Sequence, residues 1–69
     1  MGFLVLILVN GNAQPVGPTT VLAYLETLGI DPRRVAVELN LDILPKDAYA
    51  TTHLKDGDRV EIVHFVGGG

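Results

Sequence analysis

The residues with the clearest potential for chemistry are three consecutive glycines, Gly67, Gly68 and Gly69, which directly follow an apolar segment. Glycine has no side chain to pack and the most backbone freedom to lose on folding, so such a run resists ordering. We therefore expect residues 67–69 to form a flexible tail with the carboxylate of Gly69 at its tip. Three extended residues reach about 10 Å, far enough to enter the active site of a partner.

An ordinary frayed terminus is the alternative interpretation of these glycines, because small residues are common at chain ends. We favour a functional tail because the change from an apolar segment to glycine alone is abrupt. A carboxylate reacts with a nucleophile only after one oxygen becomes a good leaving group, and adenylation by ATP achieves this. The resulting acyl-adenylate is open to attack by sulfur or by an amine. Glycine suits such a site because no Cβ hinders the approach of the enzyme.

The remaining side chains offer little other chemistry. The chain contains neither Cys nor Ser, so a nucleophile of the Ser-His or Cys-His type is excluded. His53 and His64 are eleven positions apart without a third ligand nearby, and we interpret them as ordinary histidines and expect no metal site. Asp56 and Asp58 flank Gly57, and we interpret both as turn-forming residues. The secondary interpretation is that they help to form an acidic docking face. We expect a protein that is not an enzyme and binds no cofactor itself.

Length and charge narrow the class further. The 69 residues suffice for one small domain, and a hydrophobic share of 48% allows an efficient core. The net charge is −3 with only five basic residues, which argues against binding nucleic acid. The apolar segment 3–9 has the length of one strand and is too short to span a membrane. We expect a cytoplasmic protein.

The hydrophobic pattern predicts a β-hairpin, one helix and further strands before the tail. The helix begins at a cap formed by Thr19 or Thr20 and ends before Gly29, after about ten residues. Its buried stripe is predicted to contain Val21, Leu22, Leu25 and Leu28. Residues 46–49 are expected to form a single helical turn. The predicted strands are 3–9, 13–16, 35–39, 43–44, 51–54 and 59–66.

The first and last strands are the most apolar, and we expect them to be parallel neighbours. The prediction is an α+β fold: a mixed sheet of four to five strands packed on one helix, with residues 1–66 as the domain. One helix covers only one face of a sheet, so the alternating side chains of the last strand must divide between two environments.

We assign Val60 and Ile62 to the core, and Glu61, Val63 and Phe65 to an exposed face that docks a partner beside the tail. Leu4, Leu6 and Leu8, or their opposite set, would extend this face. In the alternative arrangement, the segment 40–55 folds over the face and buries it.

Four segments of the chain carry a resemblance to a known family: VAVELN (35–40), ILPK (43–46), LKDGDRVEIV (54–63) and FVGGG (65–69). They resemble the ThiS family, the sulfur carriers of thiamine biosynthesis within the ubiquitin-like β-grasp superfamily. The resemblance is close in the C-terminal half, whereas the N-terminal half agrees in pattern. Leu41 departs from it, because the family often has glycine in that turn.

This resemblance implies a reaction cycle. An E1-like adenylyltransferase would adenylate Gly69 with ATP and magnesium, while Gly67 and Gly68 thread its active site. Sulfur from a persulfide donor would replace AMP and leave a thiocarboxylate, which thiazole synthase would consume. Two other functions remain open: the small subunit of molybdopterin synthase, and a ubiquitin-like modifier conjugated to lysines.

Overall fold

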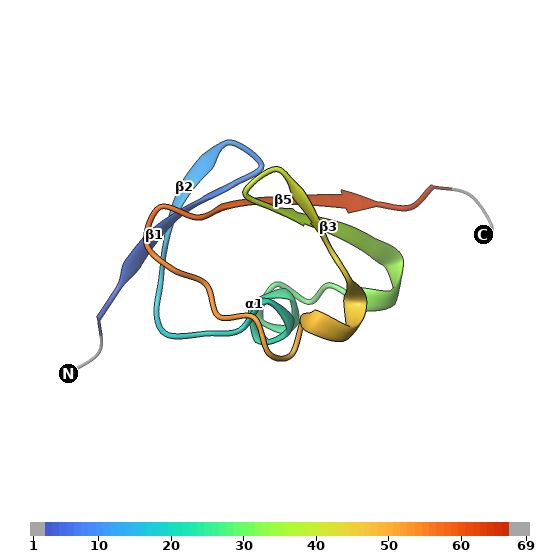
Figure 1. The fold of residues 1–69 in the computed structure, drawn as a ribbon, viewed down its shortest axis with the longest axis horizontal. Coiled ribbons are helices and arrows are strands. Elements are labelled where there is room, and N and C mark those ends of the chain that lie inside the picture. The colour runs from blue at the N-terminus through green and yellow to red at the C-terminus, as the bar shows by residue number, and fades with distance from the viewer. Residues whose placement is uncertain (1–2, 67–69) are drawn as a thin grey trace.

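The computed structural model of the chain describes residues 3–66, which form a mixed β-sheet with one α-helix lying across one of its faces (Figure 1). Gly67, Gly68 and Gly69 lie outside the described residues. The strands are β1 (Val5–Val9), β2 (Asn12–Val16), β3 (Val35–Leu39), β4 (Asp42–Leu44) and β5 (Arg59–His64). The helix is α1 (Val21–Thr27), and two 3-10 turns are η1 (Pro32–Arg34) and η2 (Lys46–Ala48).

The five strands are arranged in the order β2-β1-β5-β3-β4. β1 and β5 are parallel neighbours, as predicted, and the other pairs are antiparallel. Pro15 lies on the edge strand β2, where its missing N–H costs no ladder hydrogen bond. The α+β architecture is confirmed, and β5 is the central strand of the sheet.

The helix is capped as predicted but is shorter. The Thr20 side chain accepts a hydrogen bond of 3.1 Å from the Ala23 N–H, and Gly29 adopts a φ of +73° just beyond the helix. α1 has only seven residues, so the predicted buried stripe is wrong at its end: Leu28 is 48% exposed. Leu28 is the C-cap, one position beyond the last helical residue. Tyr24 is buried in the helix instead.

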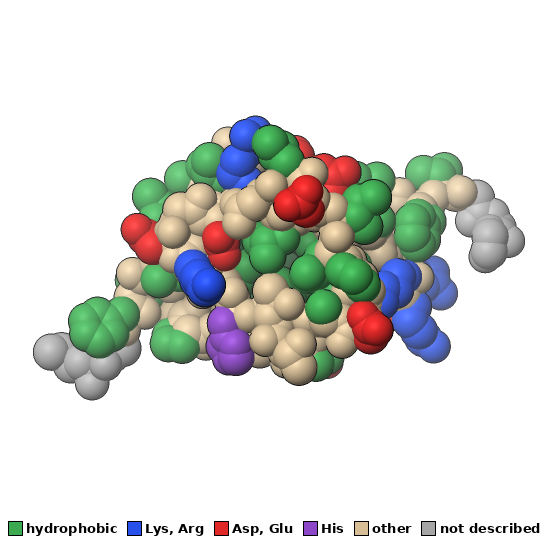
Figure 2. All heavy atoms as spheres, in the orientation of Figure 1, with side chains coloured by type: hydrophobic (Ala, Val, Ile, Leu, Met, Phe, Trp, Pro, Cys, Tyr) green, Lys and Arg blue, Asp and Glu red, His purple; other side chains and the backbone are tan. Residues whose placement is uncertain are grey.

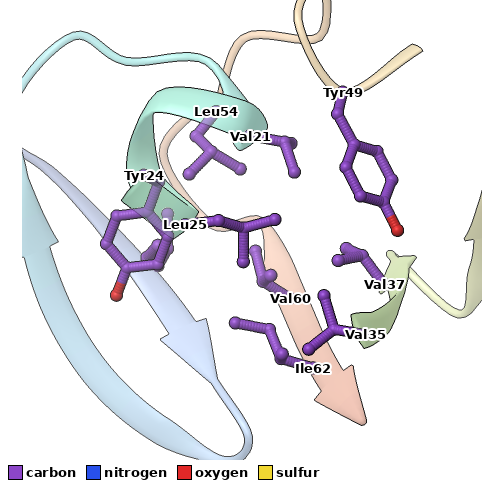
Figure 3. Close-up of a cluster of buried hydrophobic side chains, with 10 residues drawn as sticks. Val21, Tyr24, Leu25, Val35, Val37, Tyr49, Leu54, Val60 and Ile62 are labelled. Atoms are coloured by element: carbon purple, nitrogen blue, oxygen red, sulfur yellow. The ribbon is translucent and has the colours of Figure 1, made fainter. Parts of the chain in front are cut away.

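The core lies between α1 and the inner face of the sheet (Figure 3). Side chains from α1, from β3 and β5, and from the segment after β4 meet there. Val60 is 1% exposed and Ile62 is 7% exposed, which confirms the predicted core face of β5. The buried cluster consists of Ile7, Val21, Tyr24, Leu25, Val35, Val37, Tyr49, Leu54, Val60 and Ile62.

The segment between β4 and β5 packs on the helix side of the sheet. Tyr49 and Leu54 are both buried in the core, and the Leu54 N–H donates to the Thr19 C=O at 3.0 Å. The alternative in which this segment covers the outer face is therefore wrong. The predicted strand 51–54 is also wrong, since it forms only one isolated bridge, between Thr20 and His53. The Thr52 C=O and the Leu54 N–H bond to the chain at the start of α1, and the N–H groups of Thr51 and Thr52 bond back to the Ala48 C=O.

Candidate functional site

The candidate site begins with β5, the strand that leads toward the glycines. Its inner side chains are locked in the core, and its backbone pairs with β3 from Val60 opposite Leu39 to His64 opposite Val35. Pairing with β1 is shorter and involves only Arg59 and Val60. The strand is thus rigid at its start and supported on one side up to its end.

An asparagine in the β1–β2 turn continues the hydrogen bonding to β5 beyond the end of β1. Asn10 has a φ of +48°, a conformation that asparagine tolerates better than most residues. Its backbone N–H donates to the Val60 C=O at 2.9 Å. Its side-chain Oδ1 accepts from the Ile62 N–H at 2.7 Å, and its Nδ2 donates to the Ile62 C=O at 3.2 Å. The amide group therefore replaces the backbone that another residue of β1 would have supplied.

A second asparagine, in the β3–β4 turn, holds the beginning of β5 from the other side. Asn40 Oδ1 accepts from the Arg59 N–H at 2.9 Å, and Asn40 Nδ2 donates to Asp58 Oδ1 at 3.0 Å. The other oxygen of the buried Asp58 accepts from the Lys55 N–H at 2.8 Å. Asp56 accepts from the Leu6 N–H at 2.7 Å. Asp58 thus organises the turn before β5, as the sequence predicted, whereas the Asp56 side chain bonds to β1 instead of to its own turn.

The last aromatic residue before the glycines is held from two directions. The Phe65 N–H donates to the Arg34 C=O at 2.9 Å. The Lys46 ammonium lies 5.1 Å from the centroid of the Phe65 ring, within the range of a cation–π interaction, and donates to the Arg33 C=O at 3.1 Å. These contacts tie the end of β5 to the η1 and η2 turns, while Val66 is 96% exposed.

The outer face of the sheet carries exposed apolar side chains. Val63 and Phe65 are 57% and 59% exposed, in line with the prediction for the last strand. The strand register places the outward side chains of β1 and β4 on the same face. Apolar side chains are visible on the sheet side of the molecule in Figure 2. The large exposed apolar residues of this face are Leu4, Leu6, Leu8, Ile43, Val63 and Phe65.

Glu61 belongs to the same face but differs from its neighbours. It is half-buried and lies directly opposite Glu38 in the β3–β5 pair. Like charges in opposite positions of an antiparallel pair repel each other. The pair therefore places two carboxylates on this face, which also carries the exposed Arg59, two positions before Glu61 on the same strand.

A basic group of side chains lies near the C-terminal end of the described chain (Figure 2). Arg33 and Arg34 both approach Asp31, with N–O distances of 3.0 and 3.6 Å. Hydrogen bonds from the Arg33 side chain and backbone lower the pKa of Asp31 to about 2. The hydrogen bond to Asp31 in turn raises the pKa of Arg33. Asp31 stays ionised and orders the turn whose carbonyl groups hold Phe65 and Lys46.

The two histidines are exposed and lie in different parts of the fold: His53 bridges to Thr20 before α1, and His64 ends β5. Within residues 3–66, no three His, Asp or Glu side chains come close enough together to hold a metal ion. No helix among these residues is long and apolar enough to cross a membrane.

Sequence reasoning missed three residues that position β5: Asn10, Asn40 and Lys46. A signal existed for the asparagines, because each lies in a hairpin turn where a side-chain amide can reach the neighbouring strand. Lys46 could not be found in this way, since its contact with Phe65 joins segments distant in sequence.

Known proteins with similar sequences indicate the family to which this chain belongs. Residues 6–69, which include the three glycines, match the family model described as "ThiS family". The sulfur carrier protein ThiS of Bacillus subtilis is 42% identical over 50 residues, covering 72% of this chain and 76% of that protein. A thiazole synthase of Paramagnetospirillum magneticum is 48% identical over 64 residues, covering 91% of this chain. The chain spans only 20% of that thiazole synthase's length.

Solved structures agree with the sequence matches. The crystal structure of the thiamine biosynthesis protein ThiS from Geobacter metallireducens superposes with a TM-score of 0.80 at 36% identity, covering 94% of this chain and all of that one. An NMR structure of a thiamine biosynthesis protein from the same organism gives a TM-score of 0.77. The fold is therefore the expected ubiquitin-like β-grasp, and the chain belongs to the ThiS family.

Proposed function

We propose that the chain is a sulfur carrier whose Gly69 carboxylate is adenylated and then converted to a thiocarboxylate, which supplies sulfur for the thiazole ring of thiamine. The observation that carries this proposal is the family match through residue 69, because it includes the glycines as well as the domain. The relative in Bacillus subtilis is named a sulfur carrier protein, which supports the same role here. In this role the domain acts as a substrate and carrier, and the catalytic side chains belong to its partners.

The proposed reaction takes place at the carboxyl group of Gly69, in successive steps. A carboxylate oxygen of Gly69 attacks the α-phosphorus of ATP on an E1-like adenylyltransferase, and pyrophosphate leaves with magnesium. A persulfide sulfur then attacks the acyl carbon and AMP leaves. Cleavage of the S–S bond of the resulting acyl disulfide by a thiol releases the thiocarboxylate. Gly67 and Gly68 are proposed to lie in the channel of the partner, where a Cβ would obstruct the approach.

Two partners follow from this cycle. Thiazole synthase is supported as the sulfur acceptor because this chain resembles a segment of proteins that carry that name. The outer face of the sheet, with Val63, Phe65 and Glu61, is the proposed docking surface for the adenylyltransferase. A partner that covers this face would bury exposed apolar area directly beside the strand that leads to the tail.

Deletion of Gly69 tests the proposal. We expect the shortened protein to keep the thermal midpoint of the intact one, because the core lies within residues 3–66. ATP–pyrophosphate exchange with the adenylyltransferase should fall to background. A control that replaces the exposed Leu28 by Ala should retain the exchange activity, since Leu28 lies at the end of α1 and belongs neither to the buried cluster nor to the outer face of the sheet. A deletion variant that still acquires sulfur would refute the proposed role of Gly69.

A further inference from the structure

β5 extends past β1 and leaves a short length of open sheet edge on the side toward the glycines (Figure 1). The Leu8 N–H donates to the Asp58 C=O, and the Asn10 N–H donates to the Val60 C=O, both at 2.9 Å. The Asn10 side chain then accepts a hydrogen bond from the Ile62 N–H and donates one to the Ile62 C=O. Even-numbered residues of β5 therefore direct their backbone groups toward the β1 side.

The next even-numbered residue is His64, where no residue among 3–66 pairs with β5 on the β1 side. Odd-numbered residues face β3, as the hydrogen bond from the Phe65 N–H to the Arg34 C=O shows. Because neighbouring residues of a strand direct their backbone groups to opposite sides, the N–H and C=O of His64 point away from β3. Within residues 3–66, no hydrogen bond satisfies either group, and the residue is exposed.

This edge differs from the two outer edges of the sheet. β2 contains Pro15, which cannot donate, and β4 has only three residues. Short strands and proline are features that discourage edge pairing in natural sheets. The open edge at His64 belongs instead to the central strand, which β3 supports on its other side. Its donor and acceptor are exposed to solvent and have no protein partner within residues 3–66.

We propose that the edge of β5 at His64 binds an extended backbone segment of the protein that activates the tail, by strand addition on the side that β1 leaves free. This inference rests on the proposed function and adds how the activating partner holds the strand before Gly69. The partner segment would accept a hydrogen bond from the His64 N–H and donate one to its C=O. Such main-chain pairing gives affinity with little demand on the partner's sequence, and it fixes the direction of the bound chain.

Amide hydrogen exchange by NMR on the intact 15N-labelled protein tests this directly. The measurement is made alone and with the same organism's adenylyltransferase, ATP and magnesium. We expect the His64 amide to exchange freely in the isolated protein and to slow by about tenfold or more in the complex. The Phe65 amide, already bonded to Arg34, should be protected in both states and serves as the internal reference.

Three other outcomes are informative. An unprotected His64 amide in a complex that adenylates the protein would overturn the strand addition but leave the proposed function intact. An intact protein that is never adenylated would instead overturn the proposed function. Protection of His64 that appears in the isolated protein as its concentration rises would show that a second copy occupies the edge, and this would also overturn the inference.

A pair of variants provides an independent test. His64→Pro removes the outward N–H, and Val63 before it is in the extended conformation that proline requires of its predecessor. His64→Ala removes the same side chain but keeps the N–H. Relative to His64→Ala, we expect His64→Pro to raise the Kd for the adenylyltransferase by roughly fivefold to tenfold, as the loss of one hydrogen bond does. Equal Kd values for the two variants would contradict the proposal.

Discussion

At the scale of single residues, the missing Cβ of Gly68 is the feature that the proposed reaction depends on most. We expect a substitution at Gly68 to leave the core unchanged, because the buried cluster consists of residues within 3–66. Gly68→Val adds a β-branched side chain that restricts the backbone and widens the chain. We expect unfolding to be unchanged and ATP–pyrophosphate exchange to fall by about tenfold or more, which corresponds to over 1 kcal/mol. Unchanged exchange kinetics would argue against a narrow channel.

Asp31 is the residue whose ionisation orders the turn behind Phe65. Its pKa is lowered to about 2 by the hydrogen bonds from Arg33, whereas in the unfolded chain it should titrate near the ordinary value of 3.8. Because the folded pKa is the lower one, this stabilisation is present above about pH 4 and is lost as the pH falls toward 2. An NMR titration of the carboxyl group should show a midpoint near 2. In Arg33→Ala the midpoint should move toward 3.8, and an unmoved midpoint would contradict the assigned cause.

Several residues show what local sequence could and could not predict. The cap at Thr20, the glycine that follows the helix and the role of Asp58 in the turn before β5 were predictable, because each acts on its own neighbours in the chain. The side-chain amides of Asn10 and Asn40 act on β5, far along the sequence, and only the folded sheet brings them there. Leu41 adopts a φ of +74°, which its side chain disfavours; the turn forms despite the residue.

At the scale of elements, β5 divides its side chains between the core and the proposed docking face. The double variant Val63→Ser with Phe65→Ala removes two exposed apolar groups from this face. We expect its free energy of unfolding to change by about 1 kcal/mol or less, as is typical of surface sites. Its affinity for the adenylyltransferase should fall by about tenfold or more, since two buried interface contacts are lost.

Leu28→Ala is the matched control, because Leu28 is also exposed and apolar but lies at the end of α1. Its affinity should equal that of the unmodified protein. If the double variant instead unfolds several kcal/mol more easily, or binds as tightly as the control, the docking face is assigned incorrectly. Isothermal titration calorimetry and thermal unfolding together separate these results.

The order and pairing of the elements were largely predictable from hydrophobic pattern. The two most apolar strands are parallel neighbours, and the alternation along β5 gave its buried and exposed faces. The segment 51–54 was misjudged as a strand because its backbone groups bond partly to the Ala48 C=O and partly to the start of α1, and the second contact joins segments distant in sequence. The helix was overestimated because Leu28 continues the apolar period after the helix has ended.

At the scale of the whole molecule, the described domain has a packed helix side and an apolar outer sheet side, and β5 leads from the core toward the glycines (Figure 1). The net charge is −3, and this negative charge is complementary to a partner with basic groups. In the proposed cycle, the domain provides recognition, whereas Gly69 provides the reacting atom.

Intact-mass spectrometry of the protein isolated from its own cells tests this account most directly. We predict a fraction of molecules whose mass is greater by the difference between one sulfur and one oxygen atom, with the change located at Gly69 by fragmentation. The fraction should rise when thiazole synthase is absent, because the sulfur is then not consumed. A population that always carries an unmodified carboxylate, or that is instead found as isopeptide conjugates on lysines, would contradict the sulfur-carrier account.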